Sequence, residues 1–149
     1  MAGRKQFSTF VVDGLLFGVE VEKVQEVIRY QAMTRVPLAP FVVKGLINLR
    51  GQIVTAVDLR SRLGLPARPA ADLPMNVVIR HDEGAVSLLV DEIGDVLEVE
   101  EGAFELPPGT LAGEIRELVR GVYKLKEALL IALDTDKILN LVTTVARNA

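Results

Sequence analysis

Few residues in this 149-residue chain could do chemistry, and the first candidate is its only histidine. His81 stands in the stretch RHDEG, beside Asp82 and Glu83. An imidazole titrates near neutral pH, and a His-Asp-Glu cluster could in principle bind a metal ion. Consecutive side chains in a turn point apart, however, and the sequence offers no second histidine as a distant ligand. We interpret RHDEG as a solvated turn and expect no metal site and no cofactor.

Two aspartates, Asp58 and Asp134, resemble a carboxylate pair suited to acid–base catalysis. Each of them, however, occupies the same place before a short helical pattern, where aspartate is a favoured N-cap. Gly64 then ends the first pattern and Asn140 the second, and these two residue types most readily adopt the left-handed stop conformation. Capping explains both aspartates, so we expect neither to be catalytic.

A third candidate is the dipeptide Arg50-Gly51, which separates two apolar runs in VKGLINLRGQIVTAVDLRSRLG, from Val43 to Gly64. Gly51 suits a two-residue hairpin turn, because such turns require positive φ angles. Arg50 is a permanently charged, planar donor. The chain contains neither GxGxxG nor GxxxxGK[ST], the glycine patterns of phosphate-binding loops. Two interpretations of Arg50 stay open: a solvated turn residue, or a contact for another protein.

Composition narrows the class of protein. Half of the residues are apolar, enough for a sizeable core, and the absence of cysteine excludes thiol chemistry and fits a reducing cytosol. The longest apolar runs have five or six residues, against about 20 for a membrane span. We therefore expect no direct membrane insertion, and we expect no secretory signal before Asp13. An isoelectric point near 5.2 and scarce aromatic residues argue against nucleic acid as a partner.

Charge is distributed unevenly along the chain. Residues 1–70 carry ten basic and five acidic side chains, whereas residues 71–149 carry seven and fifteen. Such asymmetry can steer the approach of a partner, although two solvated surfaces that differ in composition would look the same.

Short strands joined by turns are the dominant pattern. Strands are predicted at 7–12 and 15–19 around Asp13-Gly14, at 46–49 and 52–57 around Arg50-Gly51, and at 75–80 and 85–90 around HDEG. Apolar residues at helical spacing, Val21 to Ile28, predict either a short amphipathic helix or one helical turn running into a strand. The same spacing recurs at Val90, Ile93, Val96 and Leu97 and predicts a second short helix.

The two halves of the chain repeat each other. Residues 91–97 overlay 22–28 at a shift of 69, and residues 119–134 overlay 43–58 at a shift of 76 with five of sixteen positions identical. In the second copy Lys126-Glu127 replaces Arg50-Gly51, so that turn is expected to differ in geometry.

This duplication predicts a mainly β fold of two small barrels with short helices. The first lobe is expected at roughly residues 7–65 and the second at roughly 75–141. Half a chain of about 70 residues is thin for an independent core. We therefore expect the two lobes to pack on each other.

The segments FVVDGLLFGVEVEKVQEVI, TRVPLAP and VKGLINLRGQIVTAVDLRSRLG, in this order, resemble the CheW-type chemotaxis coupling proteins. The resemblance runs from about Phe7 to Leu141. It implies one CheW-like domain over residues 1–149, built of two five-stranded SH3-like β-barrels whose terminal segments can cross to the other lobe.

The resemblance also implies a function. Members of the family are non-enzymatic cytoplasmic scaffolds, recruited to membrane-associated receptor arrays. They couple the cytoplasmic tips of methyl-accepting chemoreceptors to the regulatory domain of the histidine kinase CheA. The same module can serve a chemosensory-like pathway for pilus or gliding motility, which we keep as an alternative. A third alternative, an unrelated small enzyme or ligand-binding barrel, has no catalytic constellation to support it.

Residue by residue, the arginine of the family's NLRG motif falls on Arg50 and the glutamate of its VQE motif on Glu26. Both are associated with partner binding in the family. Apolar residues flank this glutamate and are expected to add contact area: Val24, Val27 and Ile28. Gly45 matches the glycine of the KG motif and is expected to serve backbone geometry. The other expected turn and cap residues are Gly51, Asp58, Gly64 and Asp134.

Overall fold

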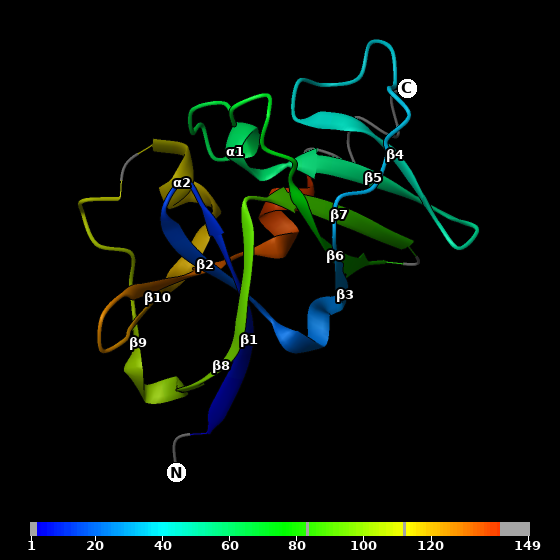
Figure 1. Cartoon of the computed structure of the whole chain (residues 1–149). Helices are drawn as coiled ribbons and strands as arrows, with labels where there is room; N and C mark the ends of the chain where they lie inside the picture. Colours follow the sequence, from blue (N-terminus) through cyan, green and yellow to red (C-terminus); the bar gives the residue numbers. More distant parts are fainter. Residues whose placement is uncertain (1–2, 83, 112, 141–149) are drawn as a thin grey trace.

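A computed structural model describes residues 3–82, 84–111 and 113–140, and strands form most of it. A six-stranded sheet, which we call lobe A, has the strand order β8-β1-β2-β11-β10-β9 (Figure 1). Its strands are β1 (Arg4–Val12), β2 (Leu15–Glu20), β8 (Glu92–Glu100), β9 (Phe104–Glu105), β10 (Val119–Lys124) and β11 (Leu129–Leu133). The sixth strand, β9, is only two residues long.

A five-stranded sheet, lobe B, has the order β3-β6-β7-β5-β4. Its strands are β3 (Val24–Ile28), β4 (Val43–Leu49), β5 (Gln52–Asp58), β6 (Met75–His81) and β7 (Gly84–Val90). The helices are short: η1 (Val21–Lys23), α1 (Leu59–Arg62), η2 (Glu101–Ala103), α2 (Gly113–Leu118) and a helical stretch at 135–140. Within the described ranges, none of these helices has the length and hydropathy needed to cross a membrane. The prediction of a mainly β fold with two lobes and short helices is confirmed. The sheets have six and five strands, where two five-stranded barrels were expected.

Neither lobe corresponds to one half of the chain. Lobe A combines β1 and β2 with β8 to β11, whereas lobe B combines β3 to β5 with β6 and β7. The chain crosses between the lobes at residues 21–23 and again at Asp91, so the boundary expected between residues 65 and 75 falls inside lobe B. The reason is strand exchange, because β3 pairs with β6 of the second half and β8 pairs with β1 of the first.

The strand registers carry the internal repeat. In lobe B Val24 lies opposite Ile79, and in lobe A Ile93 lies opposite Phe10. Ile93 follows Val24 by 69 residues, and Ile79 follows Phe10 by the same number. The hairpins β4–β5 and β10–β11 each contain a bulge, between Val43 and Gly45 in the first and between Val119 and Gly121 in the second. These bulges are 76 residues apart, as the overlay of the sequences requires. The duplication is therefore confirmed in the hydrogen-bonded structure.

The two segments with helical spacing have different outcomes. The first is one 3₁₀ turn, η1, that runs into strand β3, which is the second of the two predicted alternatives. The helix predicted at Val90 to Leu97 is wrong, because residues 92–100 form the continuous strand β8. Strand β8 pairs with β1 along nearly its whole length, and these interstrand bonds decide its conformation. A bulge opposite Ser8–Phe10 inserts an extra residue, which explains the three- and four-residue apolar spacings.

The buried apolar side chains form three clusters, one between the lobes and one inside each lobe. The largest contains residues of both sheets and therefore lies between the lobes, as expected from halves too small to fold alone. Among its fully buried members are Phe10, Phe17, Val57, Ile79 and Leu88. One smaller cluster fills lobe B around Ile47 and Leu89, and the other fills lobe A around Phe7 and Leu130.

Both aspartates that resembled a catalytic pair cap helices. Asp58 precedes α1 and its Oδ1 accepts a hydrogen bond from the backbone N–H of Arg60 at 3.3 Å. Asp134 precedes the helical stretch 135–140 and its Oδ1 accepts one from the N–H of Lys137 at 3.2 Å. Gly64 follows α1 with a φ of +71°. Asn140 is still helical, and the residues after it lie outside the described part.

Gly45 is required by a close backbone approach and not by its φ angle. A Cβ atom at this position would lie 2.7 Å from the Thr34 carbonyl oxygen and 2.9 Å from the Met33 Cβ. Thr34 and Leu46 exchange two backbone hydrogen bonds of 2.8 Å, which link the segment after β3 to the edge strand β4. Gly45 therefore allows lobe B to close.

We expect Gly45→Ala to lower the free energy of unfolding by about 2 kcal/mol, because the added methyl group must push the Thr34 backbone away. Urea unfolding would measure the loss. Gly14→Asn is the control, since nothing lies within 4 Å of a Cβ there and asparagine tolerates the observed φ of +77°. Equal unfolding midpoints for Gly45→Ala and the wild type would contradict the packing role.

Candidate protein-docking site

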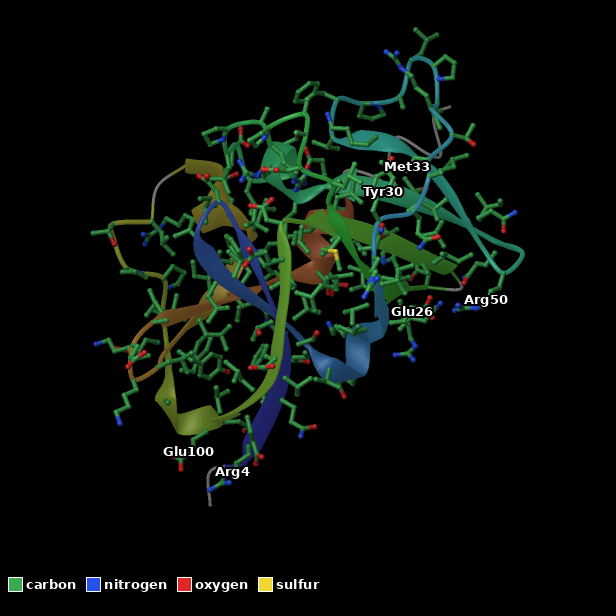
Figure 2. The ribbon with its side chains drawn as sticks, in the orientation of Figure 1. Arg4, Glu26, Tyr30, Met33, Arg50 and Glu100 are labelled. Carbon is green, nitrogen blue, oxygen red and sulfur yellow. The ribbon has the colours of Figure 1, made fainter. Side chains whose placement is uncertain are left out.

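Lobe B brings together the two charged residues singled out in the sequence. Glu26 belongs to the edge strand β3, and Arg50 stands at the turn between β4 and β5, at the opposite edge of the same sheet. The curvature of the sheet brings these edges together, as the 3.3 Å hydrogen bond from Gln25 Nε2 to Gln52 Oε1 also shows. Figure 2 shows the side chains of Glu26 and Arg50 next to each other at the margin of the lobe.

Arg50 and Glu26 form an ion pair of unequal exposure. Nη2 of Arg50 donates a hydrogen bond to Oε2 of Glu26. The arginine side chain is 72% exposed, against 23% for the glutamate. The other glutamate oxygen, Oε1, is buried and has no hydrogen-bond partner within the part of the chain that the structure describes. Glu26 thus holds the guanidinium in place from the more buried side, and Arg50 presents its charge to solvent.

The turn itself does not favour arginine at position 50. Arg50 has a φ of 51° and Gly51 a φ of 89°, the paired positive angles of a two-residue hairpin turn. Asn48 supports the turn by accepting the Gly51 N–H on Oδ1 at 2.9 Å. A left-handed backbone costs a residue with a Cβ about 1 kcal/mol, whereas glycine or asparagine would fit more easily. What arginine adds here is an exposed charge, which favours a contact for another protein over a plain turn residue.

The equivalent turn of lobe A, between β10 and β11, has a different geometry, as predicted. Residues Leu125 to Ala128 separate β10 from β11, and the Leu125 N–H donates to the Ala128 carbonyl at 2.8 Å. The second hairpin therefore lacks the tight turn that presents Arg50 in the first.

The apolar residues expected beside Glu26 divide into two groups. Val27 is 41% exposed and lies on the same strand as Glu26. Val24 packs against the cluster between the lobes, and Ile28 packs against the core of lobe B. Of the three, Val27 is thus the one that presents its side chain outward.

Sequence reasoning missed two apolar residues of this region, Tyr30 and Ile53, which are 37% and 61% exposed. Ile53 follows the turn on β5, opposite Asn48. Its neighbour Val54 is fully buried, so strand alternation places Ile53 on the outer face. That alternation was the signal from which the outward position of Ile53 could have been predicted.

A second charged cluster, which lies where the chain crosses from lobe B to lobe A, was also missed. Asp91 is the single residue between β7 and β8. Arg60 binds both of its carboxylate oxygens, with Nε at 3.0 Å and Nη2 at 2.7 Å. Arg68 adds a bond from Nε at 3.0 Å, and the backbone N–H of Asp13 adds one at 2.7 Å. Asp91 therefore ties the crossover to α1, to the following connector and to the β1–β2 turn.

The electrostatics of this cluster are those of a structural clamp. Burial alone would raise the pKa of Asp91, but the hydrogen bonds from Arg60, the Asp13 backbone and Arg68 outweigh it and lower the pKa from 3.8 to about 2. The hydrogen bond with Asp91 correspondingly raises the pKa of Arg60. The carboxylate stays ionised at neutral pH, where it locks the crossover and does not act as a base.

The only histidine of the chain, His81, ends strand β6 beside the β6–β7 turn. His81 Nε2 lies 3.5 Å from the carboxylate of Asp82, its neighbour in the β6–β7 turn, and Asp82 is 76% exposed. Among residues 3–82, 84–111 and 113–140, no three His, Cys, Asp or Glu side chains are placed to hold a metal ion. What the chain offers on its surface is a charged turn next to apolar side chains.

Comparison with known proteins identifies the family. Residues 6–143 match the sequence model of the CheW-like domain. The chain belongs to the CheW-like family. The Chemotaxis protein CheW of Bacillus subtilis is 30% identical over 88% of this chain and 84% of that protein. The CheW of Thermotoga maritima is 30% identical over 91% and 87%, and Protein PilI of Pseudomonas aeruginosa is 27% identical over 82% and 68%.

A solved CheW structure has the same fold. The scaffolding protein TtCheW from Thermoanaerobacter tengcongensis matches this chain with a TM-score of 0.81, at 26% sequence identity. The match covers 93% of this chain and 90% of the other. The CheW-type fold expected from the sequence is therefore confirmed.

Proposed function

We propose that this CheW-like chain is a non-enzymatic scaffold of a chemotaxis system. It couples the cytoplasmic tips of chemoreceptors to the regulatory domain of the histidine kinase CheA, and it works in the cytoplasm at membrane-associated receptor arrays. The observation that carries the proposal is the Arg50–Glu26 pair on lobe B, in which Arg50 is exposed and Glu26 is mostly buried, at the positions of the family's NLRG and VQE motifs. The similarity to a scaffolding protein over most of both chains supports it.

The mechanism is surface complementarity without a chemical step. Exposed apolar side chains, Val27 and Ile53 among them, supply contact area, while Arg50 and Glu26 supply orientation and discrimination between partners. Each single interface can be modest, because many linked contacts within an array act together. Partners can then exchange without the array falling apart.

A second candidate function keeps the fold and changes the pathway. The similarity to Protein PilI supports an adaptor of a chemosensory-like system that controls pilus or gliding motility. Such an adaptor would use the same surface with a different kinase and receptor, so the identity of the partners separates the two candidates.

The coupling proposal predicts complexes with two separate proteins. The chain should co-elute in gel filtration with the regulatory domain of the cognate kinase, with a receptor signalling-tip fragment, and with both together. Affinity capture from the source cell followed by mass spectrometry would name the pathway. A folded chain that co-elutes with neither protein, alone or in combination, would refute the coupling function.

A further inference from the structure

The loop between β3 and β4 lies in a segment with an unusual composition. From residue 27 to residue 57 the chain has no aspartate or glutamate, but it has four cations, Arg29, Arg35, Lys44 and Arg50. Nine large apolar side chains are exposed in the described part of the chain, and five belong to this segment: Val27, Tyr30, Leu38, Phe41 and Ile53. This stretch of lobe B therefore combines basic residues with several exposed apolar side chains, although Arg50 is paired with Glu26, just outside the stretch.

The tip of this loop, residues 36–42, projects beyond the sheet at the upper right of Figure 1. Leu38 stands between Pro37 and Pro40, and its relative exposure of 105% shows that no other part of the described chain covers it. Phe41 is 77% exposed, and the Lys44 ammonium lies 4.3 Å from the centre of its ring. A hydrogen bond of 2.9 Å from the Val43 N–H to the Pro40 carbonyl holds the loop in shape.

Leu38 occupies a conformation that leucine does not favour. Its φ is 65°, in the left-handed region, where a side chain with a Cβ costs about 1 kcal/mol and asparagine or glycine is preferred. A fully exposed leucine returns no packing energy to offset this cost. Neither the backbone nor the core of lobe B thus explains leucine at this position, and strain without a local benefit indicates a functional contact.

We propose that the loop 36–42 is a second docking element, in which Leu38 inserts into an apolar cleft of an acidic protein surface. The inference rests on the proposed scaffold function and adds the chemistry of the partner. The flanking Arg35 and Lys44, in a segment free of acids, match negative charge around that cleft. The two prolines and the hydrogen bond between Pro40 and Val43 restrict the conformation of the loop that carries Leu38. Little conformational entropy of the loop is therefore lost on binding.

The apolar anchors favour a protein over other anionic partners. A nucleic acid would neutralise the cations but offers no apolar cleft for Leu38. A second copy of this chain is the competing protein, because its strand β8 exposes Glu92, Asp95 and Glu98 around Val96. A self-contact would show as an increase in mass with concentration, which makes it a separable outcome.

The test compares Leu38→Asn with a matched control, Leu106→Asn, which removes another exposed leucine, 77% exposed, from a proline-containing loop of lobe A. Binding of each variant to the receptor signalling-tip fragment and to the kinase regulatory domain is measured by titration calorimetry. We expect Leu38→Asn to weaken at least one complex by about tenfold or more, as loss of a central apolar anchor does. Its melting temperature should equal or exceed that of the wild type, because asparagine relieves the strain. Leu106→Asn should bind like the wild type.

Each result of these measurements either supports or overturns the proposed role of Leu38. Unchanged affinity of Leu38→Asn for both probes overturns the inference while leaving the scaffold function in place. A wild type that binds neither probe overturns the scaffold function and this inference with it. Sedimentation that shows a wild-type dimer lost in Leu38→Asn would assign the loop to a second copy and so also overturn the proposal. A weakened complex of a variant that melts no lower than the wild type supports it.

Discussion

Arg50→Glu should weaken binding to the receptor tip or the kinase regulatory domain by at least about tenfold and leave the fold intact. The charge that Arg50 presents would be reversed, and the variant would place two carboxylates where the Arg50–Glu26 pair now stands. Because the arginine of this pair is 72% exposed, its loss should cost only about 1 kcal/mol of folding free energy and lower the melting temperature by a few degrees. Calorimetric titration and circular dichroism measure the two effects independently.

The double variant Arg50→Glu/Glu26→Lys separates a partner contact from an internal one. It restores an ion pair within the chain but presents the opposite charge to solvent. If Arg50 contacts a partner, the double variant should fold like the wild type and still bind poorly. Recovered binding would mean that the pair only positions its surroundings, and it would overturn the contact assignment. Unfolding of the single variant Arg50→Glu would likewise show that the residue is structural.

Asp91→Asn should lower the free energy of unfolding by about 2 to 3 kcal/mol at neutral pH. The substitution keeps the size of the side chain but removes the carboxylate that Arg60 and Arg68 share. Their charges at this mostly buried site are then offset by the longer, 3.6 Å ion pairs to Asp13 and Asp58, which is costly. Asp82→Asn is the control, because it makes the same substitution at an aspartate of the β6–β7 turn that is 76% exposed. Its effect should stay within about 0.5 kcal/mol.

The contribution of Asp91 should also depend on pH in a defined direction. Its pKa is lower in the folded chain, about 2, than the ordinary 3.8, so folding favours the ionised form. The stabilisation is complete above pH 3.8 and is lost as the pH falls toward 2. Urea unfolding at a series of pH values should therefore show the wild type and Asp91→Asn converging in acid. A constant difference between them over this range would contradict the clamp.

The features predicted best from the sequence are those that residues close together in the chain determine. The turns at Asp13-Gly14 and Arg50-Gly51 were predictable because positive φ angles select a few residue types. The cap at Asp58 was predictable because its hydrogen bond reaches a backbone N–H only two residues away. The duplication was predictable because equivalent positions in the two halves carry similar side chains. The strand registers of the structure show the same shift.

The candidate site was predictable only in part. Arg50 and Glu26 could be named from their motifs, but their contact joins two edges of one sheet and could not be seen in a list of residues. The outward direction of Val27, and the inward packing of Val24 and Ile28, depend on the pleat and curvature of β3. Leu38 gave no local signal at all, because its strain becomes visible only as a φ angle.

The sequence by itself determined the family, the mainly β class, the repeat and the local turns and caps. Tertiary structure decided which copy of each repeated strand pairs with which, why β8 is a strand, and how Asp91 meets Arg60 and Arg68. These features rest on contacts between residues that are far apart in the chain, 31 residues for Asp91 and Arg60. Repeated halves offer two nearly equivalent partners for every strand, and local propensity does not distinguish them. In the pairing observed, residues of both sheets bury the shared core between the lobes.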